Sequence, residues 1–135
     1  MDCIFCQIVA GSIPCTKIYE DEMVLAFLDI APVSAGHTLV IPKEHCDEVH
    51  NCSEKYFEAL TSVLPKIALA VSDAVSADGY NVLCNNGRAA GQLVEHLHFH
   101  IIPRMAGDGV FSHWPAGKYP PGKADEVAKK IRKSL

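Results

Sequence analysis

The sequence predicts one α+β domain, in which a five-stranded antiparallel sheet packs against one long helix and short helices lie at both ends of the chain. Short segments of β-forming residues follow one another in hairpin order instead of alternating with helices. Only one segment, after residue 53, repeats apolar residues at helical spacing over about twenty residues. With 135 residues and 49% hydrophobic content, the chain suits a single domain over residues 1–135.

The predicted strands share β-branched and aromatic residues bounded by glycine, proline or acidic turns, and cover residues 17–20, 23–29, 37–42, 80–85 and 96–102. A short helix over residues 3–10 precedes them. The long helix should start after Ser53, a good N-cap, and Pro65 predicts either a bend near residues 61–65 or an earlier start. An irregular glycine- and proline-rich segment and a basic helix over residues 124–133 should close the chain.

Charge is unevenly spread along the chain, whose net charge is -4. Residues 1–58 carry ten acidic and three basic side chains, and residues 118–135 carry six basic and two acidic ones. This short basic segment is typical of a solvated helix face, so no nucleic-acid partner is expected. The first residues lack a basic leader, and no run approaches the ~20 apolar residues of a membrane span. We therefore expect a cytoplasmic protein with no membrane partner and six reduced cysteines.

The sequence His96-Leu-His-Phe-His100 is the strongest functional signal. In an extended strand the three histidines would share one face, backed by an apolar face. A strand needs no imidazoles to fold, so a chemical role is favoured over a polar face that happens to be rich in histidine. At ~3.3 Å per residue, His96 and His100 would lie roughly 13 Å apart, too far to bind one zinc ion together. The three histidines should therefore have separate roles.

Cys3-x-x-Cys6 has the spacing of two thiolate ligands in a tetrahedral zinc site. His45 and one histidine of the triad are the natural further ligands. Two alternatives remain: the cysteines are half-buried residues of a short helix, or they form a redox pair. The redox reading is weaker because no strand precedes the motif.

His98 is then free to act as a nucleophile, since a neutral imidazole attacks phosphorus well when an acceptor holds its other nitrogen. His100 could bind a phosphate oxygen or assist the leaving group. Asn85, Gly91 and Gln92 offer amide groups and flexible backbone suited to a phosphate or ribose. The neighbouring Asn86-Gly87 is better explained as a turn.

The run His96-Leu97-His98-Phe99-His100-Ile101-Ile102 resembles the signature of the histidine-triad (HIT) family, in which three histidines alternate with apolar residues. Other segments resemble further blocks of this family in order and spacing: Cys3-Ile-Phe-Cys6-Gln-Ile, Ala26-Phe-Leu-Asp29-Ile30, Pro32, residues 36–45 and Gly91-Gln92. The resemblance covers roughly residues 3–104 and fades over the irregular segment and helix of residues 105–135.

The resemblance implies a nucleotide hydrolase or transferase in which His98 attacks an α-phosphate to form a nucleotidyl-histidine. It implies that His100 contacts the phosphate region with Asn85 and Gln92, and that Asp29 holds the ribose. The residues it implies for the base pocket are Phe5, Ile8, Phe27 and Ile30.

Structural zinc bound by Cys3, Cys6, His45 and His96 is also implied by the resemblance. So is a homodimer in which two five-stranded sheets join into one of ten strands.

The leading interpretation is hydrolysis of purine nucleoside phosphoramidates or related AMP-X compounds. Diadenosine polyphosphate hydrolysis and a non-catalytic nucleotide- and zinc-binding interaction module are the alternatives. Leu93 stands where both enzyme branches tend to carry a hydroxyl residue, which puts efficient protonation of an amine in question. Pro103-Arg104 resembles the polyphosphate branch, whereas the small size and N-terminal block fit the phosphoramidase branch.

Overall fold

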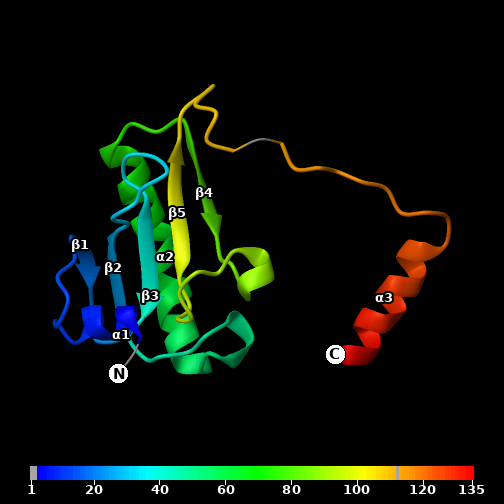
Figure 1. Ribbon diagram of the computed structural model, residues 1–135, viewed down its shortest axis with the longest axis horizontal. Helices are drawn as coiled ribbons and strands as arrows, with labels where there is room; N and C mark the ends of the chain where they lie inside the picture. Colours follow the sequence, from blue (N-terminus) through cyan, green and yellow to red (C-terminus); the bar gives the residue numbers. More distant parts are fainter. Residues whose placement is uncertain (1–2, 112) are drawn as a thin grey trace.

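The computed structural model describes residues 3–111 and 113–135, and its body is a five-stranded antiparallel sheet in the order β1-β2-β3-β5-β4 (Figure 1). The strands are β1 (Lys17–Glu20), β2 (Val24–Leu28), β3 (Thr38–Pro42), β4 (Gly79–Leu83) and β5 (Phe99–Arg104). The helices are α1 (Ile4–Val9), α2 (Glu54–Ala74) and α3 (Lys123–Ser134), with 3₁₀ turns η1 (Val49–Asn51) and η2 (Arg88–Ala90). The predicted fold class is confirmed.

The sheet is covered on both faces, which explains why β2 and β3 are buried almost throughout. Side chains alternate between the faces along each strand. On one face, strand side chains and side chains of α2 form a core cluster of Val24, Ala26, Val40, Leu60, Ile67, Ala68, Val71 and Ile101. On the other face, strand side chains pack with Phe5 of α1 in a cluster of Phe5, Leu25, Phe27, Leu39 and Ile41. His100 is paired with Leu39 across β3 and β5, so it belongs to the α1 side of the sheet.

Helix α2 begins at Glu54 with Ser53 as its N-cap, although the Ser53 side chain makes no capping hydrogen bond. The earlier start considered for this helix is therefore wrong. Pro65 lies inside the helix, where it removes the amide that would bond to the carbonyl of Thr61. The apolar stripe that packs on the sheet holds the segment helical despite this loss.

The fifth strand differs from the prediction, because β5 begins at Phe99 and continues through Pro103 to Arg104. His96 and His98 precede it, so the expectation of a regular strand from residue 96 is wrong. Pro42, at the end of β3, has no amide hydrogen to extend the ladder. The amide of Leu97 instead donates to the carbonyl of Cys46 at 2.7 Å.

Gly36 brings the start of β3 close to α2 and β5. Its φ is +89°, and a Cβ atom there would lie 3.1 Å from the Val75 side chain and 3.2 Å from that of Pro103. Glycine is needed both for this conformation and for this approach. The turn sets the position of His37, the next residue.

After β5 the chain leaves the body of the molecule (Figure 1). The described part of residues 105–122 has no helix or strand, and α3 stands apart from the sheet beyond its β4 edge. The prediction of an irregular segment followed by a basic helix is confirmed. Among the described residues, no helix has the length and apolar content needed to cross a membrane.

Candidate functional site

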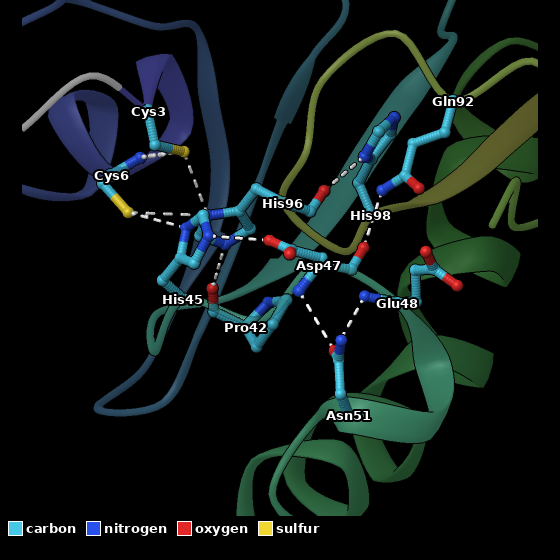
Figure 2. A network of polar contacts seen from close by, with 10 residues as sticks. All are labelled: Cys3, Cys6, Pro42, His45, Asp47, Glu48, Asn51, Gln92, His96 and His98. Carbon is cyan, nitrogen blue, oxygen red and sulfur yellow. Dashed lines mark hydrogen bonds and ion pairs between the residues drawn. The ribbon is translucent and has the colours of Figure 1, made fainter. Parts of the chain in front are cut away.

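Four side chains from three separate segments converge at one end of the sheet (Figure 2). Cys3 and Cys6 come from α1 and its N-cap, His45 from the loop after β3, and His96 from the turn before β5. Their ligand atoms all lie within 4.8 Å of one another. The Nδ1 atom of His96 is 3.4 Å from Cys3 Sγ and 3.6 Å from Cys6 Sγ, and His45 Nδ1 is 3.3 Å from Cys6 Sγ.

These distances fit a tetrahedral metal centre. Bonds of 2.0–2.3 Å in a tetrahedron place neighbouring ligand atoms roughly 3.3–3.8 Å apart. The outer nitrogens also have partners: His96 Nε2 donates to the carbonyl of Pro42 at 2.8 Å, and His45 Nε2 donates to Asp47 Oδ1 at 2.9 Å. Because both acceptors fix the proton on Nε2, both lone pairs point from Nδ1 toward the thiols. Two thiolates and two oriented imidazoles are a donor set suited to zinc.

His98 lies beside this centre, and the backbone of His96 holds its ring. Its Nδ1 is 2.7 Å from the backbone carbonyl of His96, which only accepts, so Nδ1 carries the proton. The Nε2 atom then has the free lone pair. The edge of the Phe5 ring packs against His98, with ring centroids 5.2 Å apart and planes at 88°. The imidazole is thus fixed in both tautomer and orientation.

A second hydrogen-bonded chain orients His100. The amide of Val33 donates to His37 Nδ1 at 3.2 Å, so the proton of His37 lies on Nε2. That Nε2 donates to His100 Nδ1 at 2.9 Å, which leaves the proton of His100 on its own Nε2. Asp29 Oδ2 lies 3.7 Å from His37 Nε2. The 2.9 Å separation is shorter than the spacing expected for two ligands of one metal, so Val33, His37 and His100 form a hydrogen-bonded relay, with the Asp29 carboxylate beside it.

Burial holds these histidines neutral at pH 7. Desolvation lowers the pKa of His96 to about 4, and desolvation together with the neighbouring His98 and His37 lowers the pKa of His100 to about 4. Desolvation also lowers the pKa of His37 and of His98. A neutral His98 keeps the lone pair that a nucleophile needs.

The amide-rich loop before the triad is tied to its neighbours. Gln92 is 4% exposed; its Oε1 accepts from the amide of Gly87 at 2.8 Å, and its Nε2 donates to the carbonyl of Asp47 at 2.6 Å. Asn85 Nδ2 donates to the carbonyl of Gly91, whose φ of +96° requires glycine. Gln92 thereby joins the loop before the triad to the loop that carries His45, a candidate metal ligand (Figure 2).

The candidates for a base pocket occupy two different environments. Phe5 and Phe27 are buried in edge-to-face contact at 5.6 Å, and Ile8 packs on the same cluster. Ile30, by contrast, is 96% exposed. Asp29 lies between Phe27 and Ile30 in the chain, and its Oδ1 accepts a hydrogen bond from the amide of Ala31 at 2.9 Å. The carboxylate is thus partly held by its own turn, with Oδ2 toward His37.

His37 is the residue that the sequence interpretation missed. It is 4% exposed and connects Asp29 to His100. The only local signal is its place at the start of a β-branched run directly after a glycine.

Comparison with known proteins identifies the family of the chain. The HIT domain family matches residues 10–107. The chain belongs to the HIT family.

Several HIT proteins are similar to this chain over its full length. Adenosine 5'-monophosphoramidase hnt1 of Schizosaccharomyces pombe is 46% identical, and the alignment covers 98% of this chain and 100% of that protein. The crystal structure of a HIT family member from Bacillus subtilis is 44% identical with a TM-score of 0.93, covering 100% of this chain and 98% of that one. A zinc-bound HIT family protein from Mycobacterium smegmatis is 34% identical with a TM-score of 0.76, covering 100% and 99%.

Proposed function

We propose that this HIT protein hydrolyses purine nucleoside phosphoramidates or related AMP-X compounds at the α-phosphate, through a nucleotidyl-His98 intermediate. Its class, a HIT-family hydrolase, is supported by the Schizosaccharomyces pombe monophosphoramidase at 46% identity. The observation that carries the proposal is the 2.7 Å hydrogen bond from His98 Nδ1 to the carbonyl of His96, since it leaves Nε2 free to attack.

In the proposed reaction, the lone pair on His98 Nε2 forms a bond to the α-phosphorus while the bond to the leaving group breaks. The imidazole becomes positively charged, and its Nδ1–H bond to the His96 carbonyl stabilises that charge. Water then attacks the same phosphorus, the N–P bond breaks, and AMP is released with His98 neutral again. One proton goes to the leaving group and the hydroxyl of water stays on AMP, so the overall reaction is hydrolysis.

His100 is proposed to donate its Nε2–H to a non-bridging oxygen of the phosphate, where negative charge grows in the transition state. Its ring centroid lies 5.0 Å from that of His98, so one phosphoryl group can contact both. Asp29, with a carboxylate oxygen free of the Ala31 amide, is proposed to bind ribose hydroxyls. Asn85, Gly91 and Gln92 are proposed to shape the phosphate loop, and Phe5, Ile8, Phe27 and Ile30 the base pocket.

Zinc held by Cys3, Cys6, His45 and His96 is proposed to be structural. All four protein ligands fill the tetrahedron, which leaves no open position for a substrate or water. When bound, the ion ties α1 to the loop after β3 and to the turn before β5.

A substrate panel tests the reaction. The purified protein is given an adenosine phosphoramidate, diadenosine tri- and tetraphosphate, and AMP, and product release is followed by chromatography. Turnover of the phosphoramidate with AMP as product is expected. Turnover of the polyphosphates alone would contradict the proposed substrate class, and AMP binding without turnover of any compound would instead favour an interaction module.

His37→Gln is expected to lower kcat by about 10²-fold with little change in KM, because it acts through His100 and not on the substrate. Without the imidazole, nothing fixes the proton of His100 on Nε2. The measurement is steady-state kinetics, together with the ¹⁵N chemical shifts of the His100 ring, which report its tautomer. An unchanged kcat and an unchanged tautomer would contradict the relay.

A further inference from the structure

Two loops from distant parts of the chain are joined beside the histidines. One carries His45 and covers residues 43–52, and the other is the amide-rich loop of residues 85–92. We name them the His45 loop and the amide loop. Among the described residues, the hydrogen bonds that join the amide loop to a distant segment come from Asn86 and Gln92. Its other hydrogen bonds stay within the loop or reach the neighbouring Cys84.

The two bonds between the loops complement each other. Asn86 Oδ1 accepts a hydrogen bond from the amide of Val49 at 2.7 Å. Gln92 Nε2 donates to the carbonyl of Asp47 at 2.6 Å, as Figure 2 shows. A single hydrogen bond would leave the amide loop free to pivot about it, whereas two bonds at separate points fix its orientation. Asn86 and Gln92 thus attach both ends of the amide loop to the His45 loop.

Asn86 has more than the turn role that the sequence suggests. The turn itself is present, since Gly87 has a φ of +85° and Asn86 Nδ2 donates to the carbonyl of Cys84 at 3.4 Å. This local contact uses only the nitrogen of the side-chain amide. The oxygen reaches Val49, which lies 37 residues earlier in the chain. A turn requires no such contact, so the long-range bond calls for an explanation of its own.

The position of Asn86 lets it act on the rest of the amide loop through Gly87. The amide of Gly87, the next residue, donates to Gln92 Oε1 at 2.8 Å. Gly87 is also the N-cap of η2, and its carbonyl accepts from the amide of Gln92 at 3.1 Å. The bond to Val49 therefore holds the chain at the residue from which the loop closes onto Gln92, shortly before the histidine triad.

We propose that Asn86 is a positioning residue for the reaction at His98. By accepting the amide hydrogen of Val49, it holds the amide loop in the shape that receives the α-phosphate before substrate binds. A loop that is already ordered loses less conformational freedom when the transition state forms. The inference rests on the proposed function, in which the amide loop surrounds the phosphate. Asn86 itself is not proposed to touch the substrate.

Variants at the two ends of the bond test this role. Asn86→Ala removes the acceptor, and Val49→Pro removes the donor. Proline suits position 49, because Val49 is the first residue of η1 and Glu48 before it is extended, with φ −136° and ψ 164°. Each variant should lower kcat for an adenosine phosphoramidate about 5-fold, with a smaller change in KM. Each should also speed solvent exchange of the Gly87 amide, followed by NMR, about 5-fold.

Matched controls keep one group of the bond at a time. Val49→Ala shortens the side chain but retains the amide donor, and Asn86→Asp retains the acceptor oxygen. Both should leave the exchange rate of the Gly87 amide within about 2-fold of the wild type. Val49→Ala should also keep kcat within about 2-fold.

The double variant separates loss of this bond from side effects of each substitution. Because both changes remove the same hydrogen bond, Val49→Pro should change kcat less than about 2-fold in the Asn86→Ala background. Effects that multiply, or faster Gly87 exchange with an unchanged kcat, would overturn the positioning role. A wild type that turns over no substrate would instead refute the proposed function, and the Gly87 exchange would still decide whether the bond holds the loop.

Discussion

His98→Ala should lower kcat/KM for an adenosine phosphoramidate by about 10⁴-fold or more, while AMP binding changes little. The substitution removes the Nε2 lone pair, for which no other side chain is oriented in the same place. His100 carries a proton on its Nε2 and uses Nδ1 to accept from His37, so it cannot substitute as the nucleophile. Steady-state kinetics and calorimetric titration with AMP give the two quantities.

His50→Ala is the matched control, because this histidine is largely exposed on η1 and lies outside the site. It should keep wild-type activity. Trapping adds a direct readout: brief incubation with labelled substrate and acid-free denaturation should yield nucleotide-labelled wild type and unlabelled His98→Ala. Full activity in the His98→Ala variant would remove His98 as the nucleophile.

The Cys3→Ser, Cys6→Ser double variant should lose the metal and several kcal/mol of unfolding free energy. Wild-type protein purified without added metal should contain about one zinc ion per chain. Removing both thiolates removes two ligands and releases α1, whose Phe5 covers the α1 face of the sheet. Elemental analysis and urea unfolding measure the two effects.

Cys15→Ser serves as the control, since Cys15 is a free cysteine outside the ligand group. It should keep the metal and most of the stability. A metal-free wild type that unfolds at the same urea concentration as metal-loaded protein would contradict a structural metal.

Local patterns predicted most of the fold. The strands over residues 17–20 and 37–42 end within a residue of their predicted limits, because turn residues and Pro42 mark them in the sequence. The stripe after Ser53 predicted α2, because apolar residues recur there at helical spacing. The start of β5 could not be predicted, since it depends on where the pairing of β3 with β5 stops, at Val40 and Phe99, two residues far apart in the chain.

The site was predictable where its residues share a motif. Cys3, Cys6, His45 and His96 lie together in the structure as the resemblance implied. His37 was missed because it reaches His100 only through the pairing of β3 with β5, a contact between residues far apart in the chain. The bond from Gln92 Nε2 to the carbonyl of Asp47 was missed for the same reason, since it joins Gln92 to a loop that begins after β3.

His96 makes two different contacts through different atoms. Its ring faces the thiols, and its backbone carbonyl accepts the hydrogen bond from His98 Nδ1. The candidate metal site and the proposed nucleophile therefore depend on one residue. A substitution at residue 96 would disturb both at once, so its effect on turnover could not be divided between them. The same sharing means that a chelator should act as an inhibitor without competing for the nucleotide, and that inhibition should show in kcat before it shows in affinity.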